Sequence, residues 1–149
     1  MTRLPPATSL ASLFLRLTLA AGFLSAVADR FGLWGPPGTS NVAWGNFDLF
    51  LAYTGQLLWF LPMSLVTLAG WVATTLETVL ALGLLAGVRL RETAAASGVL
   101  LASFAAAMTF GLGAEPALSS SVWTAAAGAF LLASIQPQDR HISLSMHIR

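Results

Sequence analysis

The sequence predicts an all-α membrane protein, a transmembrane four-helix bundle with an additional interfacial or re-entrant helix in its outer loop. Hydrophobic residues make up 56% of the chain and charged residues 9%, and the mean hydropathy is +0.78. Soluble domains, in contrast, are about one quarter charged. The apolar segments run unbroken for long enough to cross a bilayer as helices, whereas a membrane barrel would show alternating segments of about ten residues.

The first spanning helix is predicted over residues 10–28. Arg3, the apolar stretch after it and the triplet Ala26-Val27-Ala28 also imitate the three parts of a cleaved export signal. The core of such a signal is shorter and has no charge in its middle, whereas this segment contains Arg16. We therefore expect a retained, membrane-spanning helix.

An ordered outer loop is predicted over residues 29–45, because Pro36-Pro37-Gly38 lies at its centre and favours turns. Asn46 and Asp48 then suit an N-cap and an acidic first turn, which predicts a helix over 46–61. The short length and the polarity of this helix favour a position at the membrane interface, or a re-entrant path, over a full span.

Three further spans are predicted over residues 63–88, 93–112 and 121–135. Small residues recur along them, and small residues let helices approach closely in lipid. The four spans form one membrane domain, residues 1–135, which is followed by a cytoplasmic tail, residues 136–149.

The tail alternates apolar and polar residues from His141 to Arg149. A period of two is typical of a strand. On a helical bundle, such a strand could pair only with a second copy or with a partner protein. A disordered tail and a short interfacial segment are the alternatives.

The arginines predict the orientation of the chain. Arg16 falls within the membrane and Arg30 on one side, while the other five fall on the opposite side: Arg3, Arg89, Arg91, Arg140 and Arg149. The positive-inside rule then places both termini in the cytoplasm. We expect the protein in a bacterial inner membrane. Four tryptophans lie near the outer boundary, where indole rings concentrate: Trp34, Trp44, Trp59 and Trp123.

Two ionisable residues of opposite sign lie inside predicted spans, Arg16 in the first and Glu77 in the second. A charge within the membrane is costly and usually faces a partner, a cavity or a site. In antiparallel helices these residues lie about 10 Å and about 16 Å from the inner ends, a difference that an arginine can bridge. We expect them either to form a buried ion pair that fixes the register of the two helices or to line a cavity.

Residue patterns around these charges are more specific than those of a generic membrane segment. They comprise Phe14-Leu15-Arg16-Leu17, the stretches 23–35 and 42–47, Thr74-Thr75-Leu76-Glu77, the stretch 80–87, Arg89 and Ala94-Ala95. In this order they resemble the first two helices and the outer loop of the DoxX family of small membrane proteins. The resemblance covers roughly residues 9–135.

The resemblance implies a four-helix membrane bundle with both termini inside. The family is named for a relative of the small subunit of a thiosulfate:quinone oxidoreductase, and other members are linked to membrane-bound oxidoreductase complexes. A quinone cofactor, and either partners in a membrane redox complex or a homo-oligomer, are the corresponding expectations for this chain.

The first candidate site is catalytic and consists of Arg16 and Glu77, with Thr74, Thr75 and Thr78 around the carboxylate. In a pocket open to lipid, these groups could hold a quinone headgroup, with Arg16 polarising a carbonyl oxygen and Glu77 relaying a proton. A purely structural ion pair is the alternative.

A second candidate site lies on the outer face and includes Asp29, Arg30 and Trp44. These residues could bind an anion or a lipid headgroup around Arg30, or they could be solvated loop charges and interface anchors. The absence of cysteine excludes thiol and thiolate-metal chemistry. The two histidines lie in the tail without a ligand spacing, so we expect no metal site. No basic stripe suggests a nucleic-acid partner.

The function that these observations favour is a component of a quinone-linked membrane redox system. The main alternative is a non-catalytic structural or assembly subunit of a larger membrane complex. A solute pathway is less favoured, because one arginine and one glutamate make a poor permeation lining. A cavity at Glu77 would support the first interpretation, and a solid interior the second.

Overall fold

Three long apolar helices dominate the computed structural model, which describes residues 6–136. They are α1 (Pro6–Arg30), α3 (Met63–Ala86) and α4 (Leu90–Leu112). Each has the length and the composition of a membrane span. Large apolar side chains such as Phe14, Leu68 and Val99 are exposed on them, which a soluble surface would rarely tolerate. The fold is therefore that of a helical membrane protein.

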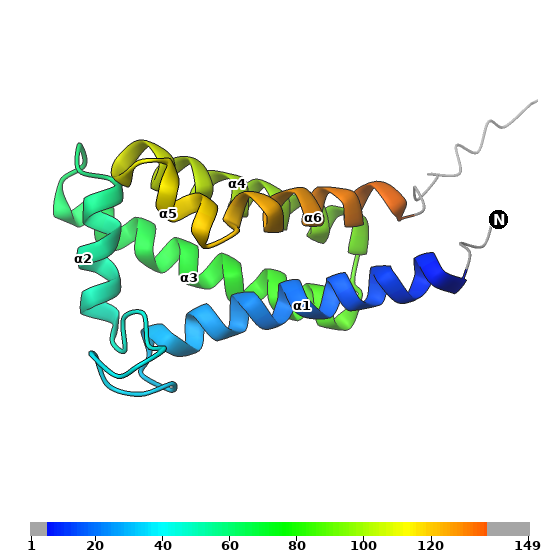
Figure 1. The fold of residues 1–149 in the computed structure, drawn as a ribbon, viewed down its shortest axis with the longest axis horizontal. Helices are drawn as coiled ribbons and strands as arrows, with labels where there is room; N and C mark the ends of the chain where they lie inside the picture. The colour runs from blue at the N-terminus through cyan, green and yellow to red at the C-terminus, as the bar shows by residue number, and fades with distance from the viewer. Residues whose placement is uncertain (1–5, 137–149) are drawn as a thin grey trace, which may run out of the picture.

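Three shorter helices complete the described part of the chain: α2 (Phe47–Leu57), α5 (Ala114–Ser119) and α6 (Val122–Ile135). In Figure 1, α1, α3, α4 and α6 run lengthwise, while α2 lies across one end of them. We call this end, covered by α2 and by residues 31–46, the capped end. The other end, where α1 begins and α6 finishes, is the opposite end.

Small residues explain how closely the helices pack. Gly98 of α4 lies against the Phe130 ring of α6, and a Cβ at this glycine would fall 2.8 Å from the ring. At the capped end, Gly111 lies against the backbone of Leu57 in the same way. The buried core between the helices consists of Leu19, Ala20, Phe23, Ala81, Leu84, Ala94, Ala129, Leu132 and Ala133.

The helix at the capped end begins as predicted. The Asn46 side chain accepts a hydrogen bond from the Leu49 N–H at 2.8 Å, and Asp48 lies in the first turn of α2. This is the capping geometry that asparagine favours, because it satisfies a backbone donor that has no partner within the helix.

Several helix bounds differ from the prediction. Helix α1 continues to Arg30, so Asp29 and Arg30 lie in its last turn and not in a loop. Helix α2 ends at Leu57, and the short helix α5 was not predicted. Helix α6 is apolar but has only 14 residues, fewer than the other three spans that were predicted with it. The alternating segment 141–149 lies outside the described residues.

Candidate functional site

A buried ion pair joins the last turn of α1 to the middle of α3. Nη2 of Arg30 donates to Oε1 of Glu77 at 2.9 Å, and Nη1 donates to Oε2 of the same carboxylate. Nη1 also donates to Oγ1 of Thr74 at 2.9 Å. Both charged residues are only 3% exposed. Such two-point pairing combines charge attraction with a fixed orientation of the guanidinium plane.

The expected pair between Arg16 and Glu77 is wrong. Helical side chains lean toward the N-terminus of their own helix. Helices α1 and α3 are antiparallel (Figure 1). The rule therefore makes Glu77 lean toward the capped end and Arg16 lean away from it. Arg30 leans back from the capped end and so meets Glu77.

Arg16 instead reaches the end of α3. Its Nη2 donates to the carbonyl oxygen of Leu85 at 2.9 Å, one of the last carbonyls of that helix, which have no partner within it. Its Nη1 lies 3.2 Å from the place that a Cβ on Gly87 would occupy. Arg16 therefore closes the end of α3, some distance from the carboxylate for which the sequence proposed it.

Only one of the three predicted threonines is hydrogen-bonded to the pair. Thr74 is buried, accepts from Arg30, and donates to the Gly70 carbonyl at 2.8 Å. Thr75 is exposed and donates to the Trp71 carbonyl, because one residue along a helix turns the side chain to another face. Thr78 donates to the Thr74 carbonyl.

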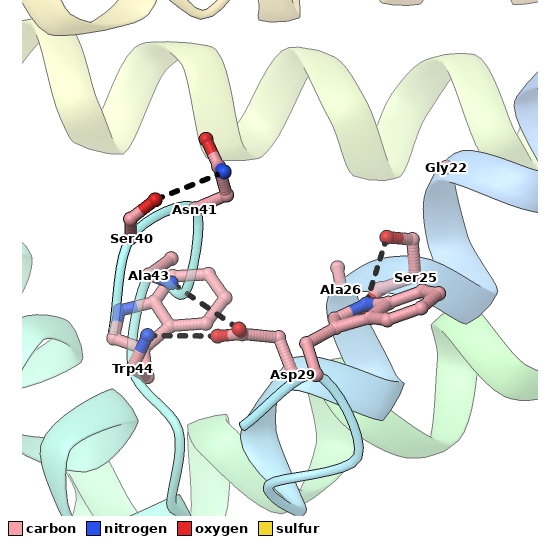
Figure 2. Close-up of a pocket in the computed structure, with 9 residues that line it drawn as sticks. Gly22, Ser25, Ala26, Asp29, Ser40, Asn41, Ala43 and Trp44 are labelled. Atoms are coloured by element: carbon pink, nitrogen blue, oxygen red, sulfur yellow. Dashed lines mark hydrogen bonds between the residues drawn. The ribbon is translucent and has the colours of Figure 1, made fainter. Parts of the chain in front are cut away.

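Asp29 holds the loop at the capped end. Its buried carboxylate accepts the backbone N–H groups of Ala43 at 3.2 Å and Trp44 at 2.7 Å, as Figure 2 shows. The backbone N–H of Gly45 lies 3.5 Å away. Asp29 thus fixes the path of the loop, and with it the position of the Trp44 ring.

Aromatic rings cover the guanidinium of Arg30. Its Cζ lies 3.9 Å from the centroid of the Phe50 ring and 5.5 Å from that of the Trp44 ring. Cations are attracted to such ring faces, more strongly where water is excluded. Trp44 was predicted at this site, whereas Phe50 was missed. The sequence feature that indicates Phe50 is its helical spacing from Thr54, since both residues face the interior from α2.

A cavity of about 810 Å³ lies beside the ion pair. Residues of α1, α3, α4 and α6 form its sides, and α2 residues such as Tyr53 and Thr54 cover it at the capped end. Its walls are largely apolar, with Arg30 and Glu77 among the few charged or polar groups. This volume falls in the range of small-molecule sites, which are mostly apolar with a few polar groups that orient the ligand.

A second, more open cavity of about 640 Å³ adjoins the first at the capped end. Figure 2 shows its lining, in which Ser25, Ser40 and Asn41 are polar and Asp29 is the charged residue. The two cavities share four lining residues: Gly22, Ala26, Ala43 and Trp44. We call them the inner cavity and the outer cavity.

The guanidinium of Arg30 has more N–H donors than its three hydrogen bonds use. Nε is buried and has no acceptor among the described residues. Nη2 donates one hydrogen to Glu77, and its second hydrogen points in the same direction as that of Nε, because the guanidinium is a planar fork. This edge of Arg30 therefore has no acceptor among the described residues.

Within residues 6–136, no three His, Cys, Asp or Glu side chains lie close enough together to hold a metal ion. Comparisons with protein-family models, with curated proteins and with solved structures found no match to this chain. The resemblance to the DoxX family stays a prediction from the residues alone.

Proposed function

We propose that the protein is the quinone-binding component of a membrane redox system, a DoxX-like four-helix bundle with α2 at the membrane interface. In this proposal α6 is the fourth span, both termini are cytoplasmic, and the capped end faces outward. The inner cavity holds the quinone ring. Arg30 takes the role that the sequence gave to Arg16, donating from its Nε and Nη2 edge to a quinone carbonyl oxygen.

The observation that carries this proposal is an arginine with unused donors in the wall of an apolar cavity. A buried donor without an acceptor costs about 1–3 kcal/mol, so a ligand that supplies an acceptor gains affinity there. Because Glu77 neutralises Arg30, a neutral carbonyl suits this edge better than a second carboxylate. Apolar walls suit a ring and its substituents, which have few polar groups of their own.

The proposal assigns the chain binding and orientation. The hydrogen bond from Arg30 would stabilise negative charge on the quinone oxygen, and the aromatic rings of Trp44 and Phe50 would hold the guanidinium in place. Electrons would come from a partner protein in the membrane, which agrees with a component of a larger complex. The cavity beside Glu77 supports this interpretation over a purely structural subunit, for which a filled interior is expected.

The test is the binding of decyl-benzoquinone to the purified chain in detergent micelles, measured by quenching of tryptophan fluorescence. The double variant Arg30→Met with Glu77→Leu removes the pair without leaving a charge buried. Loss of one charged hydrogen bond predicts Kd higher by about tenfold or more.

The matched control is Arg89→Met with Glu92→Leu. It removes an exposed ion pair of the same composition, whose charged atoms lie 3.5 Å apart, far from the inner cavity. Binding should be unchanged in this control. Equal affinity of the two double variants would contradict the proposal, as would no saturable binding to the unaltered chain.

A further inference from the structure

Helices α1 and α6 both line the inner cavity and contact each other near the opposite end. Their ribbons diverge toward the capped end (Figure 1). Near the opposite end, the Gln136 side chain donates to the Ser12 hydroxyl at 3.1 Å. One turn further along α1, the Leu15 side chain lies against α6, where a Cβ on Gly128 would fall 3.2 Å from it. These contacts close this half of the seam between the helices.

Beyond Leu15 the same seam is open. Thr18 and Gly22 of α1 and Val122 and Ala125 of α6 all line the inner cavity. Gly22 is exposed, and a Cβ placed on it would meet no atom within 4 Å. We call this stretch of the seam, formed by Thr18, Gly22, Val122 and Ala125, the wedge.

The wedge connects the inner cavity with the outside of the bundle. Thr18 and Gly22 are exposed while Arg30 at the inner wall is 3% exposed, so the cavity runs from the surface to the ion pair. Both helices lie lengthwise in the bundle, and α1 is a candidate span. The wedge therefore opens sideways, toward lipid, and not toward water at an end of the bundle.

We infer that the wedge is the passage for the hydrocarbon tail of the ligand, which leaves the inner cavity between α1 and α6 and continues into the bilayer. This inference rests on the proposed function and names the ligand class more closely: a neutral carbonyl headgroup that carries a long alkyl or isoprenoid chain. Gly22, Val122 and Ala125 offer no side-chain hydrogen bond to a chain that needs none, and the Thr18 hydroxyl already donates to the carbonyls of Phe14 and Leu15. The absence of a side chain on Gly22 leaves the width that a methylene chain requires.

The outer cavity is less suitable for the tail. Its lining includes Ser25, Ser40, Asn41 and the carboxylate of Asp29, and burying methylenes against such groups gains little free energy. Gly22 and Ala26 border both cavities, so the experiment must narrow the wedge from the α6 side as well.

The test uses two probes on the purified chain in detergent micelles: decyl-benzoquinone and the same ring without the decyl chain. Gly22→Phe and Val122→Phe each narrow the wedge from one side. Matched controls place the same phenylalanine side chain at an exposed neighbouring position outside the cavity lining: Ala21→Phe on α1 and Thr124→Phe on α6.

The expected result is Kd for decyl-benzoquinone higher by about tenfold in both wedge variants, the loss of about two buried methylenes. The tailless ring should bind each wedge variant as it binds the unaltered chain, and the controls should bind both probes normally. This pattern would support the passage.

Three outcomes would overturn it. If the tailless ring binds and the wedge variants bind decyl-benzoquinone normally, the tail leaves elsewhere and the proposed function stands. If both probes weaken equally in both wedge variants, the wedge accommodates the ring. If neither probe binds the unaltered chain, the proposed function and the passage fall together.

Discussion

Arg30 and Glu77 behave as one neutral unit at the scale of residues. Removing two charges from water costs several kcal/mol for each ion, and the cost is recovered only when they meet in good geometry with their remaining donors and acceptors satisfied. Thr74 supplies one further acceptor, and the Phe50 ring covers the guanidinium. The unit is tolerated because the two charges neutralise each other, so removing half of it should be worse than removing all of it.

The first prediction follows from this argument. Arg30→Gln leaves the Glu77 carboxylate buried without its cation, and the free energy of unfolding should fall by about 3–5 kcal/mol. Arg30→Met combined with Glu77→Leu should lie closer to the unaltered chain than this single variant does. The measurement is unfolding in detergent, followed by circular dichroism. Equal losses in the single and the double variant would contradict this argument, because removing the unpaired carboxylate would then bring no gain in stability.

The second prediction concerns Tyr53, which lines the inner cavity and is the only tyrosine of the chain. Burial raises the pKa of its phenol above the ordinary value of about 10. Because the folded state disfavours the phenolate, this contribution to stability is present below the ordinary pKa and is lost as the pH rises through the raised value. Absorbance titration of the folded chain should therefore give a midpoint at higher pH than titration of the unfolded chain.

Bound decyl-benzoquinone should move this midpoint to still higher pH, because a ligand in the inner cavity would exclude more water from the phenol. Identical midpoints for the folded and the unfolded chain would contradict the burial of Tyr53. An unchanged midpoint on adding a ligand that binds would place this ligand away from Tyr53.

The sequence allowed part of this site to be predicted. Glu77 stood out because a carboxylate in an apolar helix requires a partner, and Thr74 lies one helical turn before it. Its cation was wrongly predicted to be Arg16, because the positions of Arg16 and Glu77 along their helices are within the reach of an arginine. The opposite directions in which the two side chains lean keep them apart. The spacing of Phe50 and Thr54 indicates that α2 has a buried face, but which side chains Phe50 and Tyr53 meet depends on how α2 lies across the bundle.

At the scale of elements, two arginines connect α1 to α3 at two levels. Arg30 joins Glu77 toward the capped end, and Arg16 joins the Leu85 carbonyl near the end of α3. Gly87, the residue after α3, has φ +69° and lets the chain turn there beneath the Arg16 side chain. These two contacts hold the antiparallel helices in one register.

The third prediction tests the contact between Arg16 and the end of α3. Gly87→Ala should reduce the free energy of unfolding by about 1–2 kcal/mol for the left-handed backbone, and by more because Arg16 must move. Gly38→Ala is the matched control, because Gly38 also has a positive φ, +84°, but has open space at its Cβ position. Equal losses in the two variants would show that Arg16 does not crowd Gly87.

Arg16 also separates stability from binding. Arg16→Gln should lower the free energy of unfolding by about 1.5–3 kcal/mol, the value of a hydrogen bond to a charged group. The folded fraction should bind decyl-benzoquinone with an unchanged Kd, since Arg16 does not line the inner cavity. A Kd raised as strongly as in the double variant of Arg30 and Glu77 would restore the catalytic role that the sequence suggested.

The elements themselves were easier to predict than their bounds. Long apolar runs specify α1, α3 and α4, because periodicity and hydropathy sum over many residues. The last turn of α1 was missed since Asp29 and Arg30 are charged, and their burial depends on Glu77 and on the loop N–H groups that Asp29 accepts. Helix α5 was missed because it is a short helix within a polar connection.

At the scale of the whole molecule, the two ends of the bundle differ. The capped end carries α2, the Asp29-held loop and both cavities, whereas the half near the opposite end is closed by contacts such as that between Ser12 and Gln136. Composition predicted a membrane protein because it averages over the chain. Which helices lie side by side could not be predicted, since that depends on individual pairs such as Gly98 with Phe130.

The fourth prediction concerns the orientation of this asymmetric bundle. The excess of arginines around the turn between α3 and α4, Arg89 and Arg91, predicts that this turn is cytoplasmic and that the capped end faces outward. The chain contains no cysteine, so single cysteines report on their own position without background. In intact bacterial cells, Ser40→Cys should react with a membrane-impermeant maleimide, and Val88→Cys should react only after lysis.

Both positions are exposed in the structure, so a difference between them reports the side of the membrane and not burial. Leu68→Cys, exposed on α3 within a candidate span, is the control for a lipid-facing position and should not react in either condition. Labelling of Val88→Cys, but not Ser40→Cys, in intact cells would invert the bundle. The outer cavity would then open to the cytoplasm, and the donor of electrons would have to be sought there.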